Sequence, residues 1–204
     1  MAKRLKADDR RRQILQTAVR CFARYGYRGT TTAQLARAAR VTEPILYRHF
    51  ESKQGLFLAL LELAGSEAIR IFRTVIGPIH SPVEQLRALL RLNPAVSDPR
   101  LAELYRVVFS AQAEHTNPRI QAALRDHYLK YVQFLSSIIE QAQKAGQVRR
   151  DVSATGFAWQ LIHAAVGFAM IKPLNIPGHA TRESVEQTMA LLMEQITATD
   201  GKRP

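Results

Sequence analysis

The sequence predicts an all-α protein of about nine helices, with a small basic N-terminal module followed by a larger helical body. Apolar residues recur at helical spacing, and no useful length shows the period-two alternation of a β-strand. Capping residues, several of them followed by proline, mark the places where helices start. Charge is uneven as well: residues 1–55 hold 13 of the 29 lysines and arginines but 4 of the 17 acidic residues.

The first helix is expected over residues 8–25, with Gly26 as its C-terminal stop. One apolar stripe runs along it: Ile14, Ala18, Cys21, Phe22 and Tyr25. Thr31, with Gln34 three residues later, forms a capping box that predicts a short helix over 32–39. Thr42 is expected to cap another short helix that ends near Phe50.

Later helix starts follow the same rules. Ser52 precedes a long helix over 53–76, and three further starts place a capping side chain before a proline at the first helical position: Ser81-Pro82, Asp98-Pro99 and Asn117-Pro118. The helix after Asn117 is expected to end near Lys144, before Gly146. Ser153 and Thr181 open the last two helices, which are expected to end near Lys172 and Thr197.

Composition excludes several classes of protein. Cys21 is the only cysteine, so an intrachain disulfide is impossible and a reducing compartment is favoured. The basic N-terminus has no apolar segment of a signal peptide behind it. The longest apolar stretch, 157–171, is shorter than the roughly 20 residues that cross a bilayer and contains Gln160 and His163. We therefore expect a cytoplasmic protein with no membrane partner.

Catalysis and metal binding are not indicated. The histidines at positions 80, 115, 127, 163 and 179 lie in different segments, with no pair at ligand spacing and no HExxH motif. No Ser, His and Asp set has a recognisable context either. We expect no enzyme activity, no metal and no cofactor.

The uneven charge points to a polyanionic partner. The net charge of +12 divides into +9 over residues 1–55 and +3 over the remainder. Nucleic acid or an anionic membrane surface would suit the N-terminal excess, and plain solvation is the alternative. For Arg10, Arg11 and Arg12, a flexible arm that touches DNA and ordinary solvation remain equally open. The expected domain boundary divides residues 1–52 from residues 53–204.

Two short capped helices joined by Arg40-Val41 after a longer amphipathic helix predict a three-helix helix-turn-helix module. Its expected core is Ala18, Phe22, Leu35, Ala39, Val41, Leu46 and Phe50. If Leu46 points inward, a rotation of about 100° per residue turns Pro44 and Arg48 outward, with Ile45 and Tyr47 beside them. Such side chains can enter a major groove, where arginine reads guanine and an apolar group meets the thymine methyl.

The run from Tyr27 to Lys53 closely resembles the DNA-binding domain of the tetracycline-repressor (TetR) family of bacterial transcription regulators. The resemblance rests on Thr31-Thr32, Leu35-Ala36, Val41-Thr42, Leu46-Tyr47-Arg48-His49-Phe50 and Ser52-Lys53. It implies phosphate contacts by Thr32, Thr42, Tyr47 and Lys53, and a recognition helix carrying Glu43, Pro44, Ile45 and His49. The helical wheel adds Arg48, and the helix start at Thr31 offers N–H groups to a phosphate.

Two positions depart from the family pattern. Arg40 stands in the turn where the family usually has glycine, and a left-handed backbone there would cost on the order of 1 kcal/mol. Either the turn geometry differs, or Arg40 is retained because it reaches a phosphate. Ala33 replaces a branched apolar residue, which would loosen the packing of the second helix.

The resemblance also implies a homodimer and a ligand. The last two helices are apolar enough to form the dimer interface, and a twofold dimer would read a pseudo-palindrome. The body is expected to hold a hydrophobic or aromatic small-molecule effector, because several residues combine apolar bulk with polar tips. The candidates are Phe57, Leu61, Tyr105, Phe109, Gln112, Tyr128, Tyr131, Leu135, Trp159 and His163. Taken alone, each of them is better explained as ordinary core.

The leading hypothesis is thus a DNA-binding repressor that a small molecule releases from a pseudo-palindromic operator. The alternative is a chromosome-organising protein or an activator that binds DNA with the same module and recruits a protein partner without an effector. One or a few operators near its own gene would favour the first, and many scattered sites would favour the second.

Overall fold

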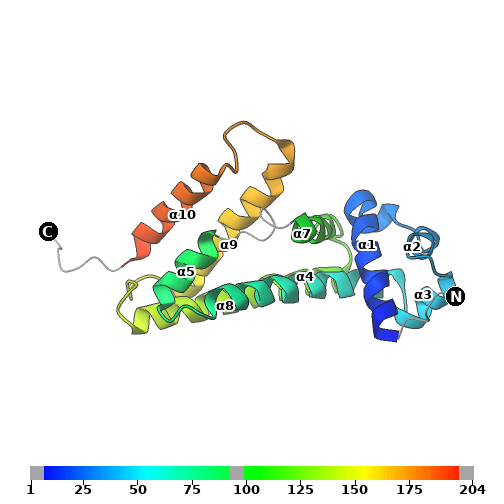
Figure 1. The fold of residues 1–204 in the computed structure, drawn as a ribbon, viewed down its shortest axis with the longest axis horizontal. Helices are drawn as coiled ribbons and strands as arrows, with labels where there is room; N and C mark the ends of the chain where they lie inside the picture. Colours follow the sequence, from blue (N-terminus) through cyan, green and yellow to red (C-terminus); the bar gives the residue numbers. More distant parts are fainter. Residues whose placement is uncertain (1–6, 92–98, 198–204) are drawn as a thin grey trace. The chain divides into compact units, whose positions relative to one another are not determined.

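The computed structural model describes residues 7–91 and 99–197, which form nine α-helices, one 3-10 turn and no strand (Figure 1). The helices are α1 Ala7–Gly29, α2 Thr32–Ala38, α3 Glu43–His49, α4 Lys53–Ile76, α5 Pro82–Arg91, α7 Pro99–Ala111, α8 Pro118–Lys144, α9 Ala154–Ile171 and α10 Arg182–Ile196, with the 3-10 turn η1 at Lys172–Leu174. The predicted all-α class is confirmed. The predicted cap Asp98 lies outside the described residues.

Most helix ends fall where the sequence placed them, and the first helix shows why one does not. Gly26 has φ 67 and ψ 179, so the helix is interrupted there as expected. A further turn to Gly29 then continues beyond the predicted stop. Tyr25, expected on the buried stripe, is 48% exposed, because it stands at the interruption rather than facing the core. Cys21 is only partly buried, and burial raises the pKa of its thiol against the lowering effect of Arg20.

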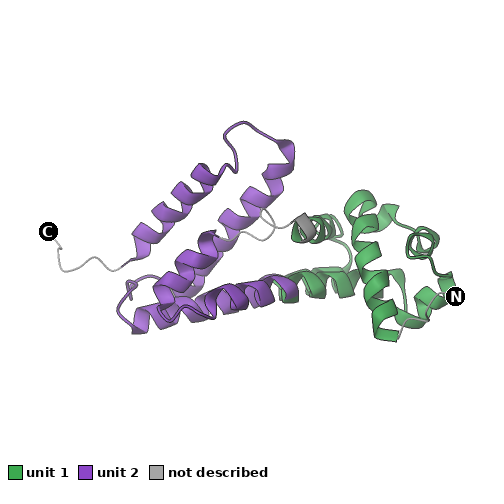
Figure 2. Cartoon of the chain, viewed as in Figure 1, with its two compact units in different colours: residues 1–66, 100–127 green, residues 67–99, 128–204 purple. Residues whose placement is uncertain are grey.

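The chain divides into two compact units, shown in separate colours in Figure 2. Unit 1 comprises residues 1–66 and 100–127, and unit 2 comprises residues 67–99 and 128–204. The division falls inside α4 and inside α8, so each of these long helices contributes to both units. Position 52, the boundary expected from sequence, lies within unit 1.

The core of unit 1 is built on the apolar stripe of α1. Phe22 and Phe57 are fully buried, and their rings meet edge to face with centroids 4.9 Å apart. Tyr27 joins them, with its ring centroid 4.9 Å from that of Phe57. Burial of each phenylalanine contributes roughly 1.5–3 kcal/mol. This aromatic cluster fixes the end of α1 against the first turns of α4.

Unit 2 has its own aromatic and aliphatic core. The Phe72 ring stacks on Phe134, with centroids 5.9 Å apart, and meets Tyr131 at 6.2 Å. Helix α5 packs against α10, whose buried side chains are Met189, Met193 and Ile196. The end of α10 is held as well, because the Arg149 N–H donates to the Ile196 carbonyl at 2.9 Å.

Helix α9 is buried over its first half only. Phe157, Ala158, Leu161 and Ile162 are buried, whereas Met170 is 51% exposed and Ile171 is 38% exposed. The segment Ala154–Leu174 passes a test of length and composition for a membrane span, and 28% of its most apolar 18-residue window is buried inside the protein; the core helix of a soluble protein passes the same test. An apolar helix with one uncovered end is equally suited to contact a second copy of the chain.

Candidate nucleic-acid interface

The helix-turn-helix module begins with the predicted capping box. The Gln34 N–H donates to the Thr31 hydroxyl at 3.2 Å, and the Thr31 N–H donates to Gln34 Oε1 at 2.8 Å. Helix α2 packs against α1 and buries Leu35 and Ala36, and its C-cap Ala39 is buried as well. These contacts orient α2 and the turn that follows it.

Helix α3 starts with a difference from the prediction. Thr42 occupies the N-cap position, but its side chain makes no capping hydrogen bond. Pro44 lies in the first turn, where its missing N–H leaves no partner unsatisfied. Leu46, 1% exposed, and Phe50, 5% exposed, hold α3 on the core of the module.

The opposite face of α3 is open, as the helical wheel predicted. Pro44 and Arg48 are exposed, and Ile45 and Tyr47 are 38% and 45% exposed. Glu43 and His49 are half-buried at the edges of this face. Ile45 and Tyr47 thus leave apolar surface on this face available to a partner. We call the following six residues the α3 face: Glu43, Pro44, Ile45, Tyr47, Arg48 and His49.

The other predicted phosphate contacts lie before and after α3 in the sequence. Thr31 and Thr42 are exposed and Thr32 is half-buried. The Thr31 hydroxyl already accepts the capping hydrogen bond, which leaves its hydroxyl proton available as a donor.

Lys53 has contacts that sequence reasoning did not foresee. Its Nζ donates to the Tyr27 carbonyl and to the Thr30 carbonyl, both at 3.0 Å, and lies 4.6 Å from the centre of the Tyr27 ring. The ammonium thereby ties the start of α4 to the segment that follows the Gly26 break. One of its three N–H donors remains for another acceptor.

The N-terminal arginines are partly held by the module. Arg10 Nη1 donates to Gln13 Oε1 at 2.7 Å, and the Arg11 guanidinium lies 4.7 Å from the centre of the Phe50 ring. Arg12 is exposed. These contacts place positive charge next to the end of α3, and both interpretations of the arginines stay open.

An ion pair in unit 1 joins α1 to the turn between α7 and α8. Arg28 Nε donates to Glu114 Oε2 at 3.0 Å. The pair is one-sided, because the Glu114 side chain is 8% exposed and the Arg28 side chain is 71% exposed. Burial and then the Glu114 charge raise the pKa of the neighbouring Tyr27. No local sequence pattern announces such a pair, since its members are far apart in the chain.

Helix α4 contacts the same turn. Gln54 Nε2 donates to Asn117 Oδ1 at 2.9 Å, and that oxygen also accepts from the Arg119 and Ile120 N–H groups at 3.2 Å. The predicted cap at Asn117 is therefore confirmed, and it is shared with α4. Together with the Arg28 pair, it links the α7–α8 turn to both α1 and α4.

The ten residues expected to line an effector site are divided between the two units. Unit 1 holds Phe57, Leu61, Tyr105, Phe109 and Gln112, and unit 2 holds Tyr128, Tyr131, Leu135, Trp159 and His163. In unit 1 the Tyr105 ring lies 6.0 Å from Phe109 and 6.0 Å from the buried His127. In unit 2 Trp159 stacks on His163 at 5.8 Å.

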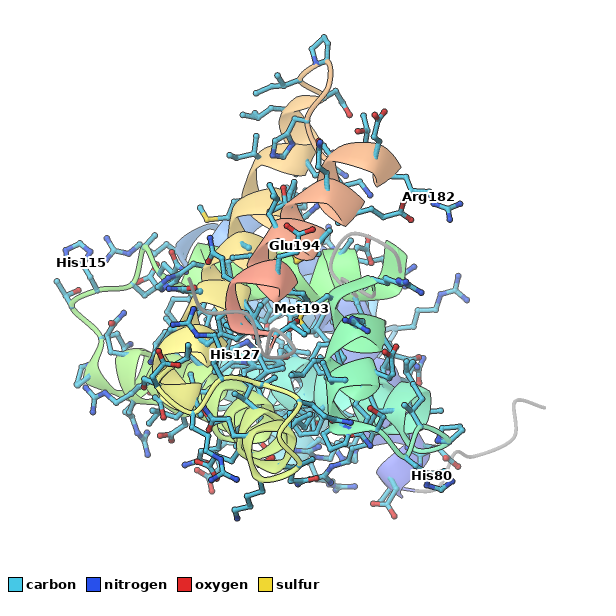
Figure 3. The ribbon with its side chains drawn as sticks, turned by 90° about the vertical axis from the view of Figure 1, so that its left-hand side faces the viewer. His80, His115, His127, Arg182, Met193 and Glu194 are labelled. Carbon is cyan, nitrogen blue, oxygen red and sulfur yellow. The ribbon has the colours of Figure 1, made fainter. Side chains whose placement is uncertain are left out.

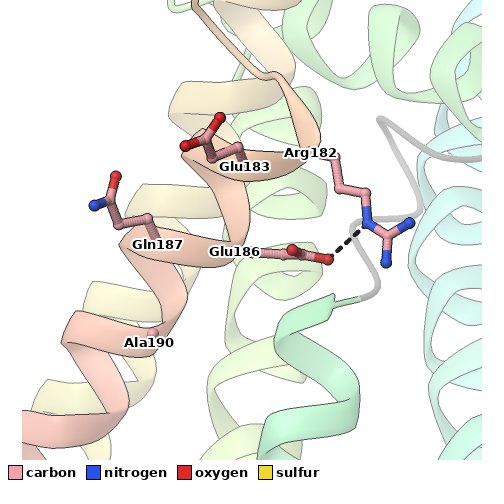
Figure 4. Close-up of a pocket in the computed structure, with 5 residues that line it drawn as sticks. All are labelled: Arg182, Glu183, Glu186, Gln187 and Ala190. Atoms are coloured by element: carbon pink, nitrogen blue, oxygen red, sulfur yellow. Dashed lines mark hydrogen bonds and ion pairs between the residues drawn. The ribbon is translucent and has the colours of Figure 1, made fainter.

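Burial differs within this set. Phe57, Leu61, Tyr131 and Leu135 are buried, whereas Gln112 and His163 are exposed and the others are intermediate. An open hollow of about 540 Å³ lies elsewhere, on α10, lined by Arg182, Glu183, Glu186, Gln187 and Ala190 (Figure 4). Its wall is a single helix face with an Arg182–Glu186 ion pair of 2.8 Å. Such a surface offers little to enclose an apolar compound.

No group of three or more His, Cys, Asp and Glu side chains among the described residues is arranged to hold a metal ion. In unit 1, His115 stands out from the α7–α8 turn, whereas His127 lies among other side chains (Figure 3).

Sequence comparison finds related regulators. The family described as "Bacterial regulatory proteins, tetR family" matches residues 14–60. The transcriptional repressor AcnR of Corynebacterium glutamicum is 30% identical over 148 residues, which are 72% of this chain and 73% of that protein. The transcriptional regulator HbdR of Aromatoleum sp. is 27% identical over 196 residues, which are 96% of this chain and 84% of that protein.

Comparison with solved structures agrees with the sequence comparison. A transcriptional regulator from Saccharomonospora viridis in complex with choline has a TM-score of 0.81 at 25% identity, covering 94% of this chain and 100% of that one. A TetR-family regulator from Cytophaga hutchinsonii has a TM-score of 0.79 at 19% identity, covering 97% of this chain and 100% of that one, which supports the fold alone.

A helix-turn-helix with an open recognition helix, carried on an all-α body, defines a DNA-binding transcription regulator. The chain belongs to the TetR family of bacterial regulatory proteins. Its named relatives are regulators and repressors, which do not act as enzymes.

Proposed function

We propose that this regulator is a cytoplasmic repressor that binds a pseudo-palindromic operator as a homodimer and leaves it when a small molecule binds the body. The observation that carries the proposal is the α3 face, where Ile45, Tyr47 and Arg48 project into solvent while Leu46 anchors the helix. The names of relatives support repression, since AcnR and the probable acrEF/envCD operon repressor of Escherichia coli are repressors.

The DNA contacts divide by chemistry. Arg48 can donate to guanine and Ile45 can contact a thymine methyl, so these two are the proposed base readers. Glu43, Pro44 and His49 complete the recognition helix. The proposed phosphate contacts, which set the position of the module on the duplex, are Thr31, Thr32, Thr42, Tyr47 and Lys53.

The homodimer is proposed to form through α9 and α10. Met170 and Ile171 on α9 and Leu191 on α10 are exposed, with Leu191 at 57%. Removal of such side chains from water favours association by about 25 cal/mol per Å² of apolar surface. A twofold dimer would present two recognition helices roughly 34–36 Å apart, or at a multiple of this spacing, along the operator.

The effector is proposed to bind within one unit of the body, at aromatic residues named above: the Tyr105–Phe109 pair of unit 1 or the Trp159–His163 pair of unit 2. Choline is the first compound to test, because the Saccharomonospora viridis relative holds it and aromatic faces attract a quaternary ammonium. A coupling of about 1–3 kcal/mol between effector and operator would change operator affinity roughly 5- to 150-fold.

A gel-shift titration against the DNA upstream of the protein's own gene tests the proposal. Tyr47→Ala should weaken binding at both low and high salt, because Tyr47 lies on the α3 face. Tyr25→Ala is the matched control, since Tyr25 is similarly exposed, at 48% against 45%, but belongs to α1.

Two further readings complete this experiment. Choline added to the complex should release DNA, and the fluorescence of Trp159, the only tryptophan, should change on binding. Wild-type affinity no higher than for random duplex, or an equal effect of the two tyrosine substitutions, would falsify the assignment of the α3 face. If no compound releases the protein from DNA, and if it binds many scattered sites on the chromosome, the alternative that recruits a protein partner is favoured.

A further inference from the structure

The turn between α2 and α3 has a backbone form that normally requires glycine. The Val41 N–H donates to the Ala36 carbonyl at 2.9 Å, and the Arg40 N–H donates to the Arg37 carbonyl at 3.1 Å. With Ala39 as C-cap, this pair of bonds is a Schellman motif, in which the residue after the cap is left-handed. That residue is Arg40, and its φ is 53.

Arginine is a poor choice for this backbone, because its β-carbon crowds the following carbonyl oxygen. Glycine meets the same need without that clash, as at Gly26, Gly146 and Gly178, although Asn175 and Ala180 are left-handed as well. The fold therefore does not need an arginine at position 40.

Among the described residues, no side-chain contact of Arg40 offsets this strain. The Arg40 side chain is exposed, and its guanidinium makes no hydrogen bond or ion pair with the parts of the chain that the structure describes. An outlier of backbone conformation without an internal partner is typical of a residue kept for a ligand.

Position and charge identify the ligand. Arg40 precedes Thr42 by two residues, so their Cα atoms are at most about 7 Å apart. It thus lies next to the first residues of the α3 face, within a module of net charge +9. A planar guanidinium suits the two oxygens of a phosphate, and it keeps its charge at any pH that the protein meets.

We infer that Arg40 contacts a phosphate of the DNA backbone, and that the left-handed strain in the turn is retained for this contact. The inference rests on the proposed function, because it places DNA against the α3 face. It adds a contact that the helical wheel of α3 does not include, since Arg40 belongs to neither helix.

Arg40→Gly separates the two effects. The melting temperature should rise by roughly 1–4 °C, because the strain is relieved. Binding to a random-sequence duplex should weaken roughly five- to tenfold for each copy bound at 0.1 M salt, and the slope of log K against log salt should fall by about 0.9 for each copy bound. Arg40→Lys should keep most of the slope, since it keeps the charge.

Two control variants isolate these causes. Ala180→Gly relieves a comparable left-handed residue, φ 52, between α9 and α10, so it should raise the melting temperature without changing the slope. Arg73→Ala removes an exposed positive charge outside the module, so it should leave the slope nearly unchanged.

Three outcomes would overturn the inference. An Arg40→Gly slope equal to that of the wild type would mean that Arg40 touches no phosphate. A change in base preference would mean that it reads bases. A fall in melting temperature would mean that the arginine serves the fold. If instead wild type and Tyr47→Ala bind the upstream DNA equally, the proposed function fails, whatever Arg40 does.

Discussion

Lys53 carries a structural contact and a proposed DNA contact on the same ammonium group. Its Nζ is 3.0 Å from both the Tyr27 and the Thr30 carbonyl. Lys53→Ala should lower the free energy of unfolding by about 1–2 kcal/mol, because two carbonyls lose a charged donor. If the third N–H reaches a phosphate, the salt slope for DNA falls by about 0.9 for each copy bound as well.

Urea denaturation measures the first effect and salt-dependent titration measures the second. Lys144→Ala is the control, since Lys144 is an exposed lysine at the end of α8. Equal stability losses in the two variants would show that the carbonyl contacts contribute nothing. An unchanged salt slope in Lys53→Ala would remove Lys53 from the DNA contacts and leave it as a positioning residue.

At the residue scale, the sequence predicted what depends on near neighbours. The Thr31–Gln34 capping box needs only a spacing of three, and it is present as expected. By contrast, the hydrogen bond from Lys53 to the Tyr27 carbonyl depends on how the chain turns at Gly26, and so does the exposure of Tyr25. A glycine shows where a helix breaks, but the direction of the following residues is decided by tertiary packing.

At the element scale, helices α1, α4 and α8 meet through polar side chains at the α7–α8 turn. Arg28→Ala should lower the free energy of unfolding by about 1–2 kcal/mol, because the Glu114 carboxylate, 8% exposed, would lose its partner inside the protein. The estimate is modest because the Arg28 side chain is 71% exposed, where solvent screens the pair.

Chemical denaturation of Arg28→Ala is best compared with Arg70→Ala. Arg70 pairs with Glu67 at 2.8 Å on the surface of α4, so its loss should have a clearly smaller effect. If both variants lose the same stability, burial of Glu114 does not strengthen its pair.

Element boundaries were predictable because caps are local. Helix α4 runs over Lys53–Ile76 as expected, and the helix from Pro118 ends at Lys144 before Gly146, whose φ is 71. The cap of α3 was expected from Thr42, yet no side-chain bond forms there, so packing of Leu46 and Phe50 has to hold the helix. The long-range hydrogen bond between Gln54 and Asn117 could not be predicted from any local sequence pattern.

At the scale of the whole molecule, the excess of positive charge lies in the N-terminal quarter of the chain, and a second exposed apolar surface besides the α3 face lies near its C-terminal end. The N-terminal residues 1–55 carry +9 of the +12, which suits DNA, and five of the exposed large apolar residues lie between Met170 and Leu191. Composition alone could locate the first but not the second, because exposure depends on which faces the fold covers. The division of the expected effector residues between two units was likewise beyond sequence patterns.

The apolar surface of α9 and α10 makes a prediction about assembly. Leu191→Glu should convert a dimer to a monomer, because a carboxylate would have to lose its water at the interface. The fold should survive, since Leu191 is 57% exposed in the single chain.

Leu129→Glu is the matched control: Leu129 is 41% exposed on α8, outside the proposed interface. Analytical ultracentrifugation should show a monomer for the first variant and a dimer for the second, and operator affinity should fall with the first alone. A dimer in both variants would move the interface away from Leu191, whereas a monomeric wild type would remove the twofold reading of a pseudo-palindrome.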